Sequence, residues 1–135
     1  MSPQSIIQER RFGEIRIAVV SEVTGDLSRV LQKCGLRSDP TMLVEHPRDE
    51  AEAILRELLW KDMAYEGECM PRERAALIAR AILAENSVTC SRFFSNGNWA
   101  RRESWNPLTE STFDAGLLVS LVGGQYFCIW FQDED

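Results

Sequence analysis

The sequence has few of the residues on which enzyme and metal chemistry most often depend. Of its 135 residues only His46 is a histidine, and it directly precedes a proline. Zinc sites usually bring their ligands in closely spaced pairs, and none of the four cysteines lies in a CxxC spacing with another. We therefore expect no metal site, no disulfide framework and free thiols. The cysteines are Cys34, Cys69, Cys90 and Cys128.

Long apolar runs are also missing. A membrane helix needs about 18 consecutive apolar residues, whereas Arg16, Glu22 and Asp26 interrupt the first apolar stretch. Residues 1–11 are mostly polar and lack the apolar segment of a secretory signal. The sequence thus argues against a membrane protein and against an exported one. We expect a cytoplasmic protein in a reducing compartment.

Positive charge is in short supply. Lysine and arginine together number 15 against 21 aspartates and glutamates, which gives a net charge of −6. Binding to nucleic acid or to an anionic membrane normally needs a cationic surface, so we expect neither kind of partner. An acidic domain suits a basic protein partner, because complementary potentials speed association. The plainer alternative is that the charge only keeps the protein soluble.

The excess of negative charge lies after residue 47. Residues 1–47 carry six cations and six anions, whereas residues 48–85 carry six cations against nine anions. Residues 86–135 carry three cations against six anions. A surface that steers a basic partner is therefore expected in the second and third of these segments.

The pattern of apolar residues predicts one α+β domain over residues 1–135, with residues 1–12 as a loose N-terminal tail. We expect a single domain in which an antiparallel sheet with a C-terminal β-hairpin packs against two or three helices. A primed two-residue turn is predicted at Gly123-Gly124, between the hairpin strands. The predicted strands cover 14–20, 88–94, 117–122 and 125–131, the predicted helices 27–34, 48–66 and 71–85, and a loop 99–112.

No catalytic constellation is recognisable in the chain. A nucleophilic serine or cysteine needs a positioned base, and a GxSxG elbow is missing. Neither GxGxxG nor GxxxxGK followed by Ser or Thr occurs, so no loop is set up to hold phosphate. Asp133-Glu134-Asp135 is better explained as a solvated acidic end than as a metal site, because neighbours in a free tail do not converge on one ion. We expect no enzyme activity, no catalytic residues, no cofactor and no metal.

Two tryptophans lie in a polar segment that also carries arginines. Trp99 and Trp105 flank Arg101 and Arg102. Exposed tryptophan and arginine are typical of the residues that dominate the energy of protein interfaces. The alternative is that both rings fold back and cover an edge of the sheet. Both interpretations stay open at the level of the sequence.

Several stretches in the second half of the chain resemble a known class of protein. They are LLWKDMAY at 58–65, FFSNGNW at 93–99, WNPLT at 105–109 and TFDAG at 112–116, with IWFQDED at the end of the chain. In this order they resemble small acidic immunity proteins, which neutralise bacterial toxins delivered by contact or by type VI secretion. The resemblance covers about residues 48–135. It implies stoichiometric binding to one cognate toxin. A toxin that acts on nucleic acid would present a basic active-site cleft to such an acidic inhibitor.

The partner-binding residues that we predict combine carboxylates for electrostatic steering with aromatic and arginine anchors. Two other classes of function stay open. One is a regulatory module or phage-borne inhibitor, of the anti-nuclease or anti-CRISPR kind, that binds another basic protein. The other is a small enzyme, which the scarcity of catalytic residue types supports least. The predicted residues are Asp62, Glu66, Glu68, Trp99, Arg101, Arg102, Trp105, Asp133, Glu134 and Asp135.

Overall fold

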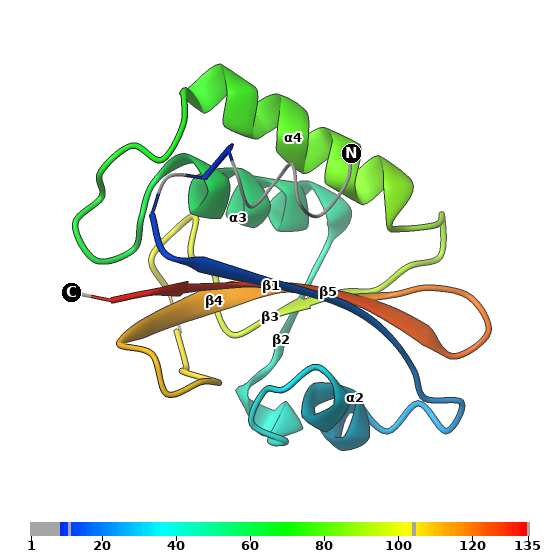
Figure 1. Cartoon of the computed structure of the whole chain (residues 1–135). Helices are drawn as coiled ribbons and strands as arrows, with labels where there is room; N and C mark the ends of the chain where they lie inside the picture. The colour runs from blue at the N-terminus through cyan, green and yellow to red at the C-terminus, as the bar shows by residue number, and fades with distance from the viewer. Residues whose placement is uncertain (1–8, 11, 104, 135) are drawn as a thin grey trace.

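A computed structural model describes residues 9–10, 12–103 and 105–134. One five-stranded antiparallel sheet, in the order β1-β5-β4-β3-β2, carries helices on both faces (Figure 1). The predicted α+β class, with an antiparallel sheet and a C-terminal hairpin, is confirmed. The elements are β1 (Glu14–Ser21), α2 (Leu27–Lys33), the short 3₁₀ helix η1 (Pro40–Met42), β2 (Val44–His46), α3 (Arg48–Trp60), α4 (Arg72–Glu85), β3 (Phe93–Ser95), β4 (Phe113–Ser120) and β5 (Gln125–Asp133).

Each face of the sheet packs its own apolar core, because the side chains of a strand alternate between the two faces. On one face α3 lies against the sheet and α4 packs on α3, and Leu58, Ile78 and Phe131 belong to the shared core. On the other face α2 covers a smaller core that includes Leu31 and Trp130. Figure 1 shows α3 and α4 above the sheet and α2 below it. The two predicted long helices thus back the hairpin, as expected.

The helix predicted over 48–66 ends earlier, at Trp60. Residues 61–71, which we call the α3–α4 loop, follow it. The carboxylate of Asp62 accepts hydrogen bonds from two backbone N–H groups of this loop, at 2.9 and 2.7 Å. Aspartate competes with a helix by binding nearby backbone groups in this way. The polar end of the predicted helix is therefore a loop with its own hydrogen bonds.

The strand predicted over 88–94 is wrong in its first half. Only Phe93 and Phe94 of that range belong to β3. Before them the hydroxyl of Ser91 accepts a hydrogen bond from the backbone N–H of Val88, at 2.9 Å, and this bond closes a turn. A serine that binds the backbone in this way favours a turn over a strand.

In the C-terminal hairpin the predicted backbone conformation of the turn is correct, but the predicted two-residue connection is too short. Gly123 and Gly124 both have positive φ, 65° and 74°, as a primed turn requires. The ladder pairing ends at Ser120 and Tyr126, so the connection is longer than two residues. A Cβ atom on Gly124 would lie 2.8 Å from the Cα of Val23, whereas one on Gly123 meets nothing within 4 Å. Gly124 is therefore the more constrained of the two.

Candidate functional site

Many of the predicted partner-binding residues gather at one end of the sheet. This end contains the start of β1, the end of β5, the α3–α4 loop and residues 96–109, which we call the tryptophan loop. Figure 1 shows the C-terminus, the α3–α4 loop and the tryptophan loop on the same side of the molecule. Met63 N–H donates to Asp133 at 2.8 Å, and Arg102 donates to Glu66 at 2.9 Å. Segments far apart in the sequence therefore meet in one region.

A buried ion pair between Arg10 and Asp133 holds this region together. Nη1 and Nη2 of Arg10 each donate to one carboxylate oxygen of Asp133 at 2.8 Å, and the two side chains are 0% and 2% exposed. Arg10 also donates to the carbonyls of Leu58 (2.8 Å) and Phe12 (2.6 Å). Asp133 accepts the further hydrogen bond from Met63. One pair thus joins the N-terminal segment, the end of α3 and β5.

This ion pair corrects two expectations from the sequence. Within the predicted loose tail, residues 1–8 and 11 lie outside the described residues, but Arg10 is buried and anchored. The predicted solvated acidic end is wrong for Asp133, while Glu134 is exposed and Asp135 lies outside the described residues. The reason is the same in both cases, because a buried guanidinium needs a carboxylate beside it.

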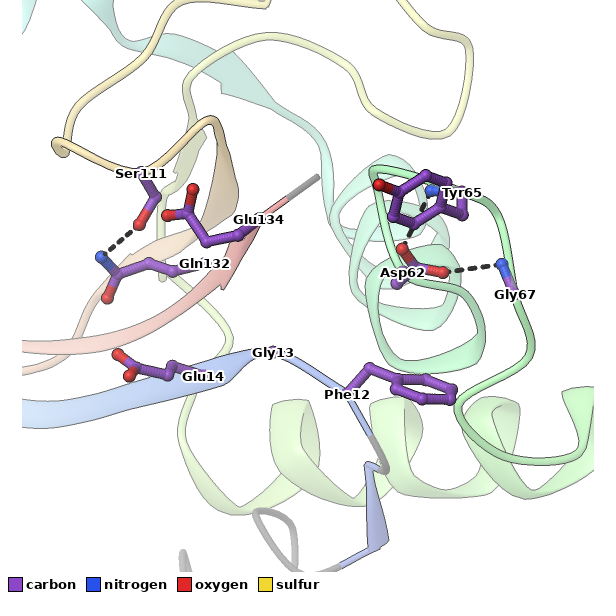
Figure 2. A pocket seen from close by; sticks show the side chains of 9 residues that line it. All are labelled: Phe12, Gly13, Glu14, Asp62, Tyr65, Gly67, Ser111, Gln132 and Glu134. Carbon is purple, nitrogen blue, oxygen red and sulfur yellow. Dashed lines mark hydrogen bonds between the residues drawn. The ribbon is translucent and has the colours of Figure 1, made fainter.

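A cavity of about 540 Å³ opens beside the ion pair. This end cavity has one wall at the ends of β1 and β5 and another in the α3–α4 loop, joined by the segment that leads into β1 (Figure 2). Its volume falls within the range of roughly 300–1,000 Å³ that is typical of ligand pockets. The residues that line it are Phe12, Gly13, Glu14, Asp62, Tyr65, Gly67, Ser111, Gln132 and Glu134.

Gly13 allows the chain to pass close to the ion pair. Its φ is 73°, a conformation that favours glycine. A Cβ atom here would lie 1.8 Å from Oδ1 of Asp133 and 2.8 Å from the carbonyl oxygen of Gln132. No larger residue fits without moving the end of β5. Gly13 therefore sets how closely Phe12 approaches the sheet.

The end cavity is lined by three carboxylates and, among the described residues, by no cationic side chain. The side chain of Glu14 is exposed and forms neither a hydrogen bond nor an ion pair with any described residue. Hydrogen bonds from Thr112, including one of 2.7 Å from its hydroxyl, lower the pKa of Glu134. Asp62 is buried, with its oxygens facing the loop N–H groups. The cavity is therefore rich in hydrogen-bond acceptors and negative at neutral pH.

Two aromatic rings are exposed at the same cavity. Phe12 is 53% exposed and Tyr65 is 72% exposed, whereas every other aromatic side chain of the described residues is buried or half-buried. Both rings line the end cavity, although they come from the segment before β1 and from the α3–α4 loop. Exposed aromatic rings are typical of surfaces that recognise other proteins.

The tryptophan loop turns its rings toward the protein interior. Trp99 and Trp105 are half-buried, pack on the core under α3, and meet edge to face at a centroid distance of 6.3 Å. Arg102 stacks on Trp99 at 4.6 Å and forms an ion pair of 2.9 Å with Glu66, which lowers the pKa of Glu66. Of the two interpretations left open by the sequence, this packing favours rings that fold back on the sheet.

A fully buried carboxylate, Asp114, organises the same loop. Its oxygens accept hydrogen bonds from the backbone N–H groups of Leu108 and Thr109, both at 3.0 Å, and from the indole of Trp130, also at 3.0 Å. The side-chain amide of Asn96 donates to the backbone carbonyl of Asp114 at 2.8 Å. These residues belong to the stretches that carry the resemblance. Their visible role is to fix the tryptophan loop against β4 and β5.

The other predicted residues that the structure describes lie apart from the cavity lining. Glu68 is exposed and accepts a hydrogen bond from the indole N–H of Trp60 at 2.8 Å. Arg101 is exposed and lines a separate depression at the start of α3. Of the predicted residues that the structure describes, Asp62 and Glu134 alone line the end cavity. Sequence reasoning missed Arg10, Phe12, Glu14, Tyr65 and Gln132.

The histidine and the cysteines are used elsewhere in the fold. His46 is buried, with Nε2 2.7 Å from the carbonyl oxygen of Gly97. All four thiols are free, and Cys90 is exposed while the other three are buried. A hydrogen bond between Cys34 and Cys128 lowers the pKa of Cys34 and raises that of Cys128. None of these residues lines the end cavity.

No protein-family model matches the chain, and comparison with the curated proteins and with the solved structures also gives no match. Within the part of the chain that the structure describes, no helix has the length and apolar character needed to cross a membrane. Over the same residues, no group of three or more histidine, cysteine, aspartate or glutamate side chains is placed to hold a metal ion.

Proposed function

We propose that this protein is an immunity protein that binds a basic bacterial toxin in a stoichiometric complex and blocks it without catalysis. The observation that carries the proposal is the end cavity, which two exposed rings and three carboxylates line. The resemblance of residues 48–135 to small acidic immunity proteins supports the same role. A toxin delivered by contact or by type VI secretion is the partner that this resemblance implies.

The charge of the molecule favours fast association with a basic partner. The net charge is −6, and the exposed carboxylate of Glu14 forms no ion pair with a described residue. Complementary charge speeds encounter and rejects wrong partners, whereas buried aromatic anchors slow dissociation. Both elements lie at the same end of the sheet.

A prearranged surface also favours tight binding. The Arg10–Asp133 pair and the hydrogen bonds of Asp62 hold the two walls of the end cavity in place before any partner arrives. Ordering a flexible loop during association weakens binding, and a surface that is already ordered avoids this loss. The surface therefore suits an inhibitor that must act as soon as its toxin appears.

The experiment is co-expression with the C-terminal domain encoded by the gene directly upstream. We expect a one-to-one complex by size-exclusion chromatography with light scattering, and rescue of growth when that domain is toxic. Rescue should require at least equimolar protein, because a stoichiometric inhibitor is consumed one molecule at a time. Rescue at a small fraction of the toxin concentration would indicate an enzyme instead. Absence of both complex and rescue would overturn the proposal.

A further inference from the structure

We propose that two copies of this chain pair through the outer edges of their β1 strands, so that the two sheets join across a two-fold axis into one. The inference goes beyond the proposed function, because it concerns the outer edge of β1 and needs no toxin. Three observations carry it: the length and composition of this edge, the backbone groups that point outward along it, and a register in which the strand is complementary to itself.

β1 is one of the two outer strands of the sheet (Figure 1). It has eight residues and pairs with β5 without interruption from Glu14 to Ser21, whereas the other outer strand, β2, has three residues. Proteins usually protect a long edge strand with lysine, proline or a bulge, and β1 has none of these. Its one cation, Arg16, is turned toward the end of α2, where it donates to the carbonyl of Gly35. An edge of this kind accepts a further strand.

The hydrogen bonds between β1 and β5 show which backbone groups of β1 point outward. In an antiparallel ladder, hydrogen-bonded pairs of residues alternate with pairs whose N–H and C=O groups point away from each other. The N–H of Glu22 donates to the carbonyl of Gly124 at 2.7 Å, in the same register as the rest of the ladder. The even-numbered residues of β1 therefore bond to β5. The odd-numbered residues turn their backbone groups to the outer edge.

Three successive outward residues have no backbone partner among the described residues. They are Ile15, Ile17 and Val19. At the next outward position the carbonyl of Ser21 already accepts a hydrogen bond from Nζ of Lys33. Each of the three residues offers one donor and one acceptor, and backbone groups of this kind pair strongly with another strand. The available edge is therefore centred on Ile17.

This set of three residues is complementary to itself. When Ile17 lies opposite Ile17 of an antiparallel second copy, Ile15 lies opposite Val19 of that copy and Val19 lies opposite Ile15. Every outward N–H and C=O of the three residues then finds a partner. A two-fold axis through Ile17 relates the two strands, as in the closed dimers that are commonest among oligomers. The second copy of the chain is therefore the occupant that fits this edge.

The side chains agree with the same register. Val19 is 59% exposed, and it lies on the face of the sheet where Ile15 packs against the core under α3. Pairing places each Val19 beside Ile15 of the other copy, and aliphatic cross-strand pairs of this kind stabilise a sheet. The charged residues of the strand, Glu14 and Arg16, both lie opposite uncharged residues of the second copy. No like charges are therefore directly opposed.

The net charge gives this pairing a characteristic dependence on salt. Each copy carries a charge of −6, so two copies repel each other at low ionic strength. Salt screens that repulsion, and the dimer should become tighter as the salt concentration rises. Association with a basic toxin should respond in the opposite direction. Failure of the dimer would leave the immunity role standing, and absence of a toxin complex would leave the dimer standing.

The test is sedimentation velocity of the full-length protein alone, from about 1 µM to about 500 µM, at about 0.05 and 0.5 M NaCl. We expect a mixture of monomer and dimer that shifts toward dimer with concentration and with salt. A monomer under every condition would overturn the proposal. Growth into larger oligomers would also overturn it, because pairing uses the outer edge of each β1 and closes the assembly.

A substitution on the edge identifies the interface. Val19→Lys should raise the dissociation constant of the dimer at least about tenfold, because it sets a charge against an aliphatic side chain of the other copy. The control is Leu77→Lys, which makes the same change of charge at an aliphatic residue of α4 that is 54% exposed. Circular dichroism checks that both variants are folded. Equal weakening in the two variants, or none in Val19→Lys, would overturn the assignment of the edge.

Amide hydrogen exchange of the unmodified protein tests the register directly. The N–H groups of Ile15, Ile17 and Val19 should exchange rapidly in the monomer and more slowly as the dimer forms. The N–H groups of Arg16 and Ala18 bond to β5 and should be protected in both states. A dimer that leaves exchange at the three outward residues unchanged would contradict pairing through β1.

Discussion

At the scale of single residues, the Arg10–Asp133 pair is the centre of the candidate site. Replacing either partner of a buried ion pair leaves an uncompensated buried charge. The free energy lost in this way is larger than the net stabilisation that the intact pair provides. Here the pair also positions Phe12 and Met63, through hydrogen bonds of 2.6 and 2.8 Å. Asp133 is therefore a buried positioning residue beside the end cavity.

Asp133→Ala should lower the free energy of unfolding by about 3–5 kcal/mol, because Arg10 would stay buried without a carboxylate. Urea unfolding followed by tryptophan fluorescence measures this loss. The control is Glu110→Ala, since Glu110 pairs with Arg37 but is 95% exposed. An exposed pair contributes at most about 1 kcal/mol. Similar losses in the two variants would show that the Arg10–Asp133 pair is not buried as described.

The ion pair between Glu66 and Arg102 predicts a specific titration. Arg102 lowers the pKa of Glu66 below its ordinary value of 4.5. Because the folded-state pKa is depressed, this pair stabilises the fold above the ordinary pKa, and the contribution is lost as the pH falls through the lowered value. An NMR titration of the Glu66 carboxyl carbon should give a midpoint below 4.5 in the wild type and a higher one in Arg102→Gln. Identical midpoints would contradict the contact.

At the scale of helices and strands, strong periodicity made most elements predictable. The apolar stripes of α3 and α4 and the alternation of β1 follow directly from the sequence. The end of α3 was not predictable in this way. The apolar spacing of the helix continues to Met63, but the carboxylate of Asp62 accepts hydrogen bonds from loop N–H groups and the helix ends before it. The early start predicted for β3 fails for a similar reason at Ser91. Local side-chain hydrogen bonds outweighed the periodic pattern in both places.

The tryptophan loop depends on Asp114, whose carboxylate accepts backbone N–H groups of two loop residues. Asp114→Asn should lower the free energy of unfolding by at least about 2 kcal/mol, because the new amide turns a donor toward other donors. It should also change the fluorescence of Trp105, whose indole N–H donates to the Asp114 carbonyl. Thermal unfolding and emission spectra measure the two effects.

The control for Asp114→Asn is Asp49→Asn, the same chemical change at an exposed position in the first turn of α3. There the loss should stay within about 1 kcal/mol, since only an interaction with the helix dipole weakens. An Asp114→Asn variant as stable as Asp49→Asn, with unchanged emission, would show that the loop does not rely on this carboxylate.

At the scale of the whole molecule, the charge balance was readable from the sequence and the shape of the site was not. Net charge and the acidic character of residues 48–135 need no structure. The cavity needs Arg10 to meet a carboxylate 123 residues away, and no local pattern reports such a pairing. The same holds for Phe12 and Tyr65, which come from separate segments and line one cavity only because of the fold.

The central claim is that this acidic end of the sheet recognises a basic partner, and the most direct measurement is the association rate as a function of salt. Stopped-flow mixing with the proposed toxin partner, once the co-expression experiment has identified it, gives this rate. The Debye length shrinks from about 10 Å at 0.1 M to about 3 Å at 1 M, so the rate should fall steeply over that range. The double variant Glu14→Lys/Glu134→Lys should lower the association rate about tenfold at low salt. The control is Asp49→Lys/Glu85→Lys, which makes the same change of charge at the opposite end of α3 and α4 and should lower the rate much less. A rate that is indifferent to salt, or equal in the two double variants, would contradict the account.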